Sequence, residues 1–247
     1  MSNFDAYETK TFAERVDGNP YVGRGIVIGM TPDGKNAVTA YFIMGRSENS
    51  RNRIFCWVDE GVMIKPFDES KVEDPSLIIY YPLRDLPSGD IIVTNGDQTD
   101  TIYEFVEKGS TFEEALRTRE FEPDGPNWTP RISGIINFND SPKGFTYKMA
   151  INKSGDPEGK SNLRFFYEYE PVEGVGHFLH TYMGDGSPLP TFTGEPERVV
   201  IPSDMSDFIQ EIWNNLNEEN LISLYVRYSN LDTGECEELL MNKHQQE

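Results

Sequence analysis

Cysteine and histidine are scarce in this sequence. The 247 residues include 2 cysteines and 3 histidines, and Cys56 and Cys236 lie far apart with no Cys-x-x-Cys pairing. This argues against a disulfide framework or a zinc site and favours a reduced cytosolic protein with buried thiols. His177 and His180 are three positions apart in a strand-like segment, where that offset places side chains on opposite faces. We therefore expect no metal site.

Positive charge is also scarce. The chain has 22 Lys and Arg against 42 Asp and Glu, a net charge of -20. Nonspecific nucleic-acid binding and docking to anionic membranes depend on basic residues, so both are disfavoured. Long apolar runs are absent too, since no stretch resembles a signal peptide or approaches the roughly 20 apolar residues of a membrane span. These absences predict a cytoplasmic protein with no nucleic-acid or membrane partner.

Against this acidic background, the stretch GRSENSRNR gathers Arg46, Arg51 and Arg53. Arginine suits phosphates and carboxylates, because its planar guanidinium donates hydrogen bonds in pairs and keeps its charge. From the local sequence alone, a surface turn with ion pairs to Glu48 and Asp59 is the competing interpretation. The stretch is therefore either a receiving site for a small anion or a solvated turn.

Apolar, β-branched runs separated by turn residues dominate the chain. The Pro-Asp-Gly of TPDGK predicts a hairpin between YVGRGIVIGM and NAVTAYFIM. Further strands are expected at IFCWVD, LIIYYPL, DIIVTN, RISGIINF, GFTYKMAIN, LRFFYEYE, GHFLHTYM, LISLYVRYSN and CEELLM. This pattern predicts an α+β fold of mainly antiparallel sheets with helices on their outer faces.

Three helices are expected. One runs over about 99–108, and a second opens at Ser110 or Thr111 with a capping box. The third is SDMSDFIQEIWNNLN, whose apolar residues fall on one face. We expect residues 1–18 to be a polar N-terminal extension and residues 19–247 to form one domain.

Two loops have the residue types of a binding site. In VTNGDQTDTIYE, Asn95 and Gly96 end a strand just before a helix, whose N-terminus can receive an anion. The alternative is a turn capped by Asp97 or Thr99. In REFEPDGPNWTPRI, Glu122 and its neighbours either serve a site or form a solvated acidic loop.

Familiar catalytic and cofactor motifs are absent. The glycine-rich GVGHFLHTYMGDGSPLP has neither Rossmann nor P-loop spacing, and no Gly-x-Ser-x-Gly elbow occurs. The residues thus give no support for a nucleotide cofactor or a serine nucleophile.

Five stretches in order carry a family resemblance: YVGR, AYFIMGRSENSRNR, TNGDQTD, TPRI and TYMGDGSPLPTFTGEP. Together they resemble the archaeal-type IMP cyclohydrolases over about residues 19–230. The resemblance implies a four-layer αββα sandwich of mainly antiparallel sheets, of the N-terminal-nucleophile hydrolase type. It implies closure of 5-formamidoimidazole-4-carboxamide ribonucleotide (FAICAR) to inosine monophosphate (IMP) and water in purine synthesis. It also implies a purine nucleotide as the substrate and no cofactor. A homo-oligomer such as a dimer or tetramer is compatible with a sandwich of this size.

By this resemblance, Arg51, Tyr80 and Glu122 match the active-site Arg, Tyr and Glu of the family. Arg51 would orient the carboxamide or stabilise charge, Tyr80 would donate to the formyl oxygen, and Glu122 would act as base or proton shuttle. Tyr81 and Arg53 are the alternatives to Tyr80 and Arg51. The implied substrate-binding residues are Arg24, Arg46, Ser47, Arg53, Asn95, Gly96, Thr99, Asp100 and Arg131.

The chain departs from the family pattern in places. Asp97 and Gln98 stand where the pattern has Ser-His, and ENS replaces a Phe-Pro-Asn run in the arginine stretch. Tyr21 opens the first strand where a nucleophilic Cys, Ser or Thr would stand, which argues against amide hydrolysis on the same fold. Amide hydrolysis is the second hypothesis, and a purine-nucleotide-binding protein without catalysis is the third.

Overall fold

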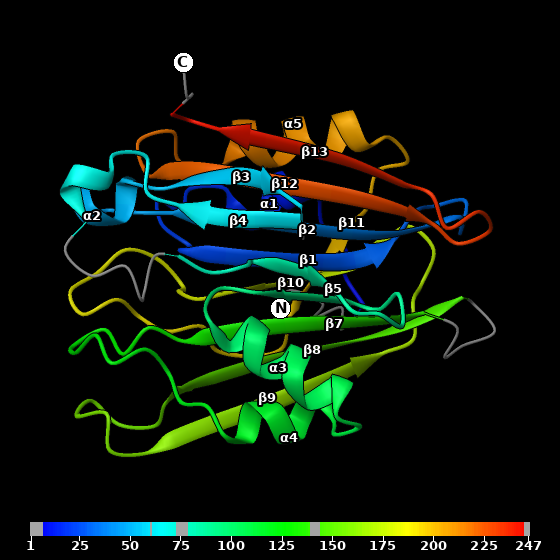
Figure 1. Ribbon diagram of the computed structural model, residues 1–247. Coiled ribbons are helices and arrows are strands. Elements are labelled where there is room, and N and C mark those ends of the chain that lie inside the picture. The colour runs from blue at the N-terminus through cyan, green and yellow to red at the C-terminus, as the bar shows by residue number, and fades with distance from the viewer. Residues whose placement is uncertain (1–6, 60, 73–78, 139–143, 245–247) are drawn as a thin grey trace, which may run out of the picture.

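The computed structural model describes residues 7–59, 61–72, 79–138 and 144–244, which form two antiparallel sheets packed face to face (Figure 1). The first sheet consists of β1 (Arg24–Met30), β2 (Asn36–Met44), β10 (Val175–His180), β11 (Glu197–Val200), β12 (Leu221–Asn230) and β13 (Cys236–Asn242). Its spatial order is β11-β10-β1-β2-β12-β13. The predicted hairpin is confirmed, with β1 and β2 in register from Arg24↔Ile43 to Met30↔Ala37.

The second sheet has strands that follow one another in chain order, β3-β4-β5-β6-β7-β8-β9. They are β3 (Ile54–Val58), β4 (Gly61–Lys65), β5 (Leu83–Asp85), β6 (Ile91–Thr94), β7 (Arg131–Phe138), β8 (Phe145–Ser154) and β9 (Asn162–Tyr169). The strands β4 and β11 were not predicted, because each is short and lacks a clear turn signal on both sides.

The strand expected at LIIYYPL lies partly outside the described residues. Residues 79–82 form no regular strand. Of the expected strand, only its last residue, Leu83, lies in a regular strand, β5. The segment still joins the sheet, since the Tyr80 carbonyl accepts a hydrogen bond from the Ile64 amide at 3.0 Å and the Pro82 carbonyl accepts one from Thr94 at 2.9 Å. Pro82 has no N–H to donate, which interrupts the regular ladder.

The helices are α1 (Phe12–Val16), α2 (Glu48–Arg51), α3 (Gln98–Glu107), α4 (Phe112–Arg117) and α5 (Met205–Asn215), with a 3₁₀ turn at Glu69–Lys71. The capping box of α4 is confirmed, because the Thr111 side chain accepts from the Glu114 amide and the Glu114 side chain accepts from the Thr111 amide. The expected amphipathic helix is α5, capped by Asp204. None of the helices within the described ranges is long and apolar enough to cross a membrane.

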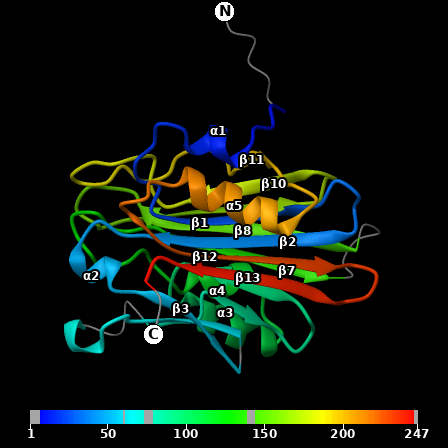
Figure 2. The same ribbon diagram turned by 90° about the horizontal axis from the view of Figure 1, so that it is seen from above.

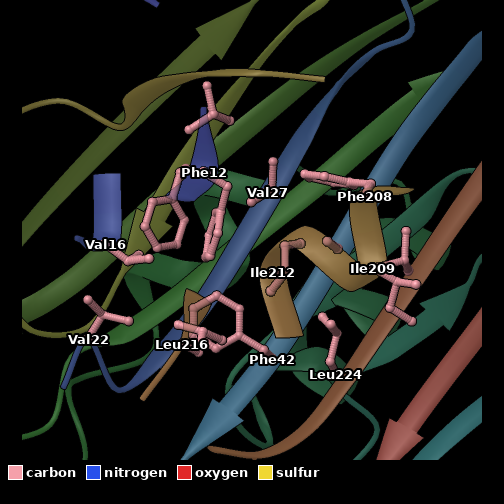
Figure 3. Packing of buried hydrophobic residues seen from close by; sticks show 14 of the residues in the cluster. Phe12, Val16, Val22, Val27, Phe42, Phe208, Ile209, Ile212, Leu216 and Leu224 are labelled. Atoms are coloured by element: carbon pink, nitrogen blue, oxygen red, sulfur yellow. The ribbon is translucent and has the colours of Figure 1, made fainter. Parts of the chain in front are cut away.

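Three apolar clusters hold the elements together. The first lies between one face of the β1–β2 sheet and the helices α1 and α5, which lie side by side over it (Figures 2 and 3). The second fills the space between the two sheets and includes Ile26, Tyr41 and Ile132. The third lies between the outer face of the second sheet and the helices α3 and α4.

The helix α1 belongs to the segment that was expected to be a polar extension. Its residues Phe12 and Val16 are buried, and the Phe12 ring contacts the rings of Phe42 and Phe178. The Ala13 amide also donates to the Glu211 carboxylate of α5 at 3.1 Å. The helix α1 is therefore packed onto the core through Phe12 and Val16.

Candidate active site

Five polar side chains from distant parts of the chain converge near one end of the space between the sheets. Arg24 is the first residue of β1, Arg53 directly precedes β3, and Tyr80 lies in the extended segment before β5. Glu122 follows α4, and Arg131 is the first residue of β7. Burial is nearly complete, with relative exposures of 3% for Arg53, 4% for Tyr80 and 7% for Glu122. We call these five residues the buried polar cluster.

The ion pair between Arg24 and Glu122 is central to the cluster. The Arg24 Nη2 and Glu122 Oε2 atoms are 3.7 Å apart, and both side chains are almost wholly buried. Arg24 Nε is buried without a hydrogen-bond partner among the described residues. A buried, unpaired donor costs free energy, so the Nε–H group is suited to donate a hydrogen bond to an oxygen of a bound ligand.

Tyr80, rather than Tyr81, faces the cluster. Tyr80 interacts electrostatically with Arg24, Arg53 and Glu122, and its hydroxyl lies 2.9 Å from the Tyr41 hydroxyl. The Tyr81 ring instead lies under the Arg84 guanidinium, whose Cζ atom is 5.5 Å from the centroid of the ring. Consecutive residues of an extended segment point to opposite sides, which explains the difference.

The cluster carries more positive than negative charge. Burial lowers the pKa of Arg53, and the like charge of Arg24 lowers it further. Burial is the largest single effect on Arg24 and acts to lower its pKa, but the Glu122 carboxylate and the neighbouring tyrosines together outweigh burial, so the net pKa is raised. The Arg53 guanidinium donates only one hydrogen bond within the described residues, from Nε to the Ser50 carbonyl at 2.8 Å. Two neighbouring guanidiniums with free donors form a site for an anion.

Glu122 is held in place by its backbone, since its amide donates to the Thr129 carbonyl at 2.9 Å. Burial raises the pKa of its carboxyl group, and the arginines Arg24, Arg131 and Arg53 offset this only in part. A carboxyl group with a raised pKa exchanges a proton near neutral pH more readily than an exposed one does. The pKa of the Tyr80 phenol is also raised by burial, so it stays protonated and able to donate.

The loop between β6 and α3 supports Arg131. Arg131 Nη1 donates to Gln98 Oε1 at 2.7 Å and lies 2.7 Å from Asp97 Oδ1. The Gln98 Nε2 atom donates to Asn95 Oδ1, and Asn95 also accepts from the Ile132 amide. At Gly96 a Cβ would come within 2.5 Å of Arg131 Nη1, so a larger residue there would displace the end of the Arg131 side chain. Asp97 and Gln98, the two positions that depart from the family pattern, thus hold Arg131 in place.

The side chain of Asp97 does not cap α3, although it was one of the two expected caps. Asp97 is the N-cap residue of α3, yet its side chain makes no capping hydrogen bond. Its carboxylate pairs instead with Arg119 and Arg131, which outweigh burial and lower its pKa. Thr99 donates to the Gly96 carbonyl at 3.1 Å and stabilises the turn.

The three arginines of the stretch GRSENSRNR do not point to the same place. Arg53 enters the cluster, whereas Arg51 lies at the end of α2, half exposed, with its Nη2 donating to Asn220 Oδ1 at 2.9 Å. Arg46 pairs with Asp185 at the surface. Arg46 and Arg51 thus make surface ion pairs, but with the distant residues Asp185 and Glu219 and not with the expected Glu48 and Asp59. Arg53 is the member of the stretch that contacts the cluster.

Two more residues assigned to substrate binding have structural contacts of their own. Ser47 caps α2 by accepting from the Ser50 amide at 3.1 Å. Asp100 pairs with Arg84 at 2.8 Å, and half of its side chain is exposed. The geometry does not bring Ser47 or Asp100 into contact with Glu122.

Sequence reasoning missed two phenols at the cluster, Tyr41 and Tyr182. Tyr182 interacts electrostatically with Arg24 and Glu122, and its hydroxyl is 2.5 Å from Thr129 Oγ1. The available signal was a tyrosine within a buried apolar strand, because a buried hydroxyl needs a polar partner. No group of three His, Cys, Asp or Glu side chains gathers as metal ligands would among the residues that the structure describes.

Comparison with known proteins identifies the class to which this fold and cluster belong. Residues 21–234 match the family model of the IMP cyclohydrolase-like proteins, and the chain belongs to this family. It is 32% identical over 154 residues to the IMP cyclohydrolase of Methanocella arvoryzae, which covers 61% of this chain and 74% of that protein. It is 34% identical over 156 residues to the IMP cyclohydrolase of Methanococcus maripaludis strain S2, covering 60% of this chain and 75% of that protein. The family resemblance predicted from five motifs is confirmed.

Proposed function

We propose that this protein is an IMP cyclohydrolase, which closes FAICAR to IMP with loss of water. Membership of the IMP cyclohydrolase-like family supports the reaction. The observation that carries the proposal at the level of residues is the buried Glu122 carboxyl group, paired with Arg24 at 3.7 Å and close to the Tyr80 phenol.

The reaction needs a proton to move from nitrogen to oxygen. The carboxamide nitrogen attacks the formyl carbon, a C–N bond forms, and the nitrogen loses a proton. The former formyl oxygen takes up this proton and a second one, which the nitrogen that carried the formyl group releases as its C=N bond forms. The C–O bond then breaks and the oxygen leaves as water, so the reaction balances without a co-reactant. Glu122 takes the proton from the nitrogen and returns it to the departing oxygen. Tyr80 donates a hydrogen bond to that oxygen as its negative charge develops.

Arg53 takes the role that the family resemblance gave to Arg51. Arg53 is 97% buried beside Tyr80 and Arg24, with donors free of protein partners among the described residues. A nucleotide phosphate would be repelled by a chain of net charge -20 unless basic groups received it. Arg24, Arg53 and Arg131 provide such groups, and the substrate is a small-molecule purine nucleotide.

The fold supports the same proposal. The packing order of α1 and α5, the two sheets, and α3 and α4 fits a four-layer αββα sandwich of the N-terminal-nucleophile hydrolase type. The proposed single domain includes α1, since its apolar residues contribute to the core. Asn95, Gly96 and Thr99 shape the loop that holds Arg131, and we place them at the edge of the substrate site.

Three variants and a matched control test these roles. Glu122→Gln should lower kcat by about 10²- to 10⁴-fold, the usual loss when a general acid–base group is removed. Tyr80→Phe and Arg53→Ala should each cost about 10²- to 10³-fold, as loss of a donor to developing charge does. Arg51→Ala removes the same type of side chain from the same stretch and should stay within about threefold of the wild type. Full turnover by Glu122→Gln would overturn the assignment of the base.

Binding without catalysis is distinguished by a thermal melt. A ligand at about 100 times its Kd stabilises the folded state by about 2.7 kcal/mol. A rise in Tm with IMP but no turnover of FAICAR would favour the nucleotide-binding alternative over the cyclohydrolase.

A further inference from the structure

Tyr41 is a buried phenol next to the proposed donor Tyr80. It lies in β2 on the face that points between the sheets, and its side chain is fully buried. Its ring stacks on Phe55 with centroids 5.7 Å apart and an interplanar angle of 16°. Its hydroxyl lies 2.9 Å from the Tyr80 hydroxyl, the one hydrogen bond that its side chain makes within the described residues. Packing therefore fixes both the ring and its partner.

The surroundings of the two hydroxyls decide which of them donates. Arg24 and Arg53 both act on Tyr80 and favour negative charge on its oxygen, because a guanidinium only donates. The same arginines also act on Tyr41, but burial outweighs them there and raises its pKa well above the ordinary value. Either hydroxyl can donate at this distance, and the arginines beside Tyr80 favour the arrangement in which Tyr41 donates and the Tyr80 oxygen accepts. This leaves the Tyr80 proton directed away from Tyr41.

We propose that Tyr41 is a positioning residue for the cyclisation. By donating to the Tyr80 oxygen at 2.9 Å, Tyr41 turns the Tyr80 proton toward the formyl oxygen of the bound substrate. The same hydrogen bond stabilises the partial negative charge that Tyr80 gains as it donates. The inference rests on the proposed function, in which Tyr80 contacts the reacting oxygen.

The test compares Tyr41→Phe with Tyr147→Phe. Each variant removes one buried hydroxyl from the core between the sheets, and the Tyr147 hydroxyl bonds to His177 Nδ1 at 2.6 Å instead of to the cluster. Tyr41→Phe should lower kcat by about tenfold, which corresponds to one hydrogen bond, with KM within twofold of the wild type. Tyr147→Phe should lose similar stability but keep its kcat.

A second readout does not depend on turnover. A fluorinated tyrosine at position 80 reports the pKa of that phenol through its fluorine NMR signal. Tyr41→Phe should raise this pKa by about one unit, because the donor that stabilises the phenolate is lost. Tyr147→Phe should leave it unchanged, since a general loosening of the core would act on both variants alike.

The outcomes separate the two proposals. If Tyr80→Phe is inactive while Tyr41→Phe keeps the wild-type kcat and the same phenol pKa, the inference fails and the proposed function stands. If Tyr80→Phe retains full turnover, the positioning role is overturned together with the role of Tyr80. If the wild type does not turn over FAICAR, the proposed function fails, and an unchanged pKa in the fluorine titration would then also refute donation by Tyr41.

Discussion

Removing the ring of Phe12 tests whether α1 is part of the folded core. The Phe12 side chain is fully buried and lies near Phe42 (Figure 3). Its ring centroid is 5.0 Å from that of Phe178 and 5.9 Å from that of Phe42. Phe12→Ala loses the transfer free energy of the ring and leaves a cavity among these side chains. Such substitutions cost about 3–5 kcal/mol, and the complete burial of Phe12 favours about 4 kcal/mol.

The assay is urea unfolding of the wild type and of Phe12→Ala, with Phe67→Ala as the control. The Phe67 side chain is 42% exposed and stacks on His244, so its removal should cost less than about 1 kcal/mol. The urea midpoint of Phe12→Ala should fall while the slope stays the same. In thermal melts, Tm should fall by about 8–16 °C for a chain of this size. Equal midpoints for Phe12→Ala and Phe67→Ala would refute the packing of α1 and support a polar extension.

Two further predictions concern pH. Burial raises the pKa of Glu122 above 4.5, so the folded state binds this proton more tightly, and ionisation at higher pH costs stability. Glu122→Gln should match the wild type in Tm near pH 4 and exceed it at pH 7; a lower Tm at pH 7 would contradict this. For His177, burial lowers the pKa from 6.5 to about 4, and the charge of Arg198 adds to this, so stability is lost as pH falls from 6.5 toward 4. Between pH 7 and pH 5, the wild type should lose about 2 kcal/mol more than His177→Gln in urea unfolding, whereas equal losses would mean that His177 titrates normally.

Local signals in the sequence predicted much of the fold. The Pro-Asp-Gly turn gives the β1–β2 hairpin, the Thr111 capping box gives α4, and the apolar face around Ile212 gives α5. Each of these depends on residues close together in the chain. The short helix α1 has a local signal of the same kind, a capping box between Thr11 and Glu14, but its five residues contain too few apolar positions to show a period. Its burial depends on partners in β2 and β10.

The candidate site was predicted less completely for the same reason. Tyr80 and Glu122 were found through motifs and are placed together by the structure. The choice between Arg51 and Arg53 depends on the path of α2, which turns one guanidinium inward and the other outward. Tyr41 could not be assigned from sequence, because its contact with Tyr80 joins β2 of the first sheet to the segment that precedes β5 of the second.

The most direct test of the central claim is to add FAICAR to pure, metal-free protein and follow the ultraviolet absorbance as the purine ring closes. We expect conversion to IMP at a rate proportional to the concentration of wild-type protein, with conversion largely lost in Glu122→Gln. No conversion by folded wild-type protein, or equal conversion by both proteins, would contradict the assignment of this buried cluster as a cyclohydrolase active site.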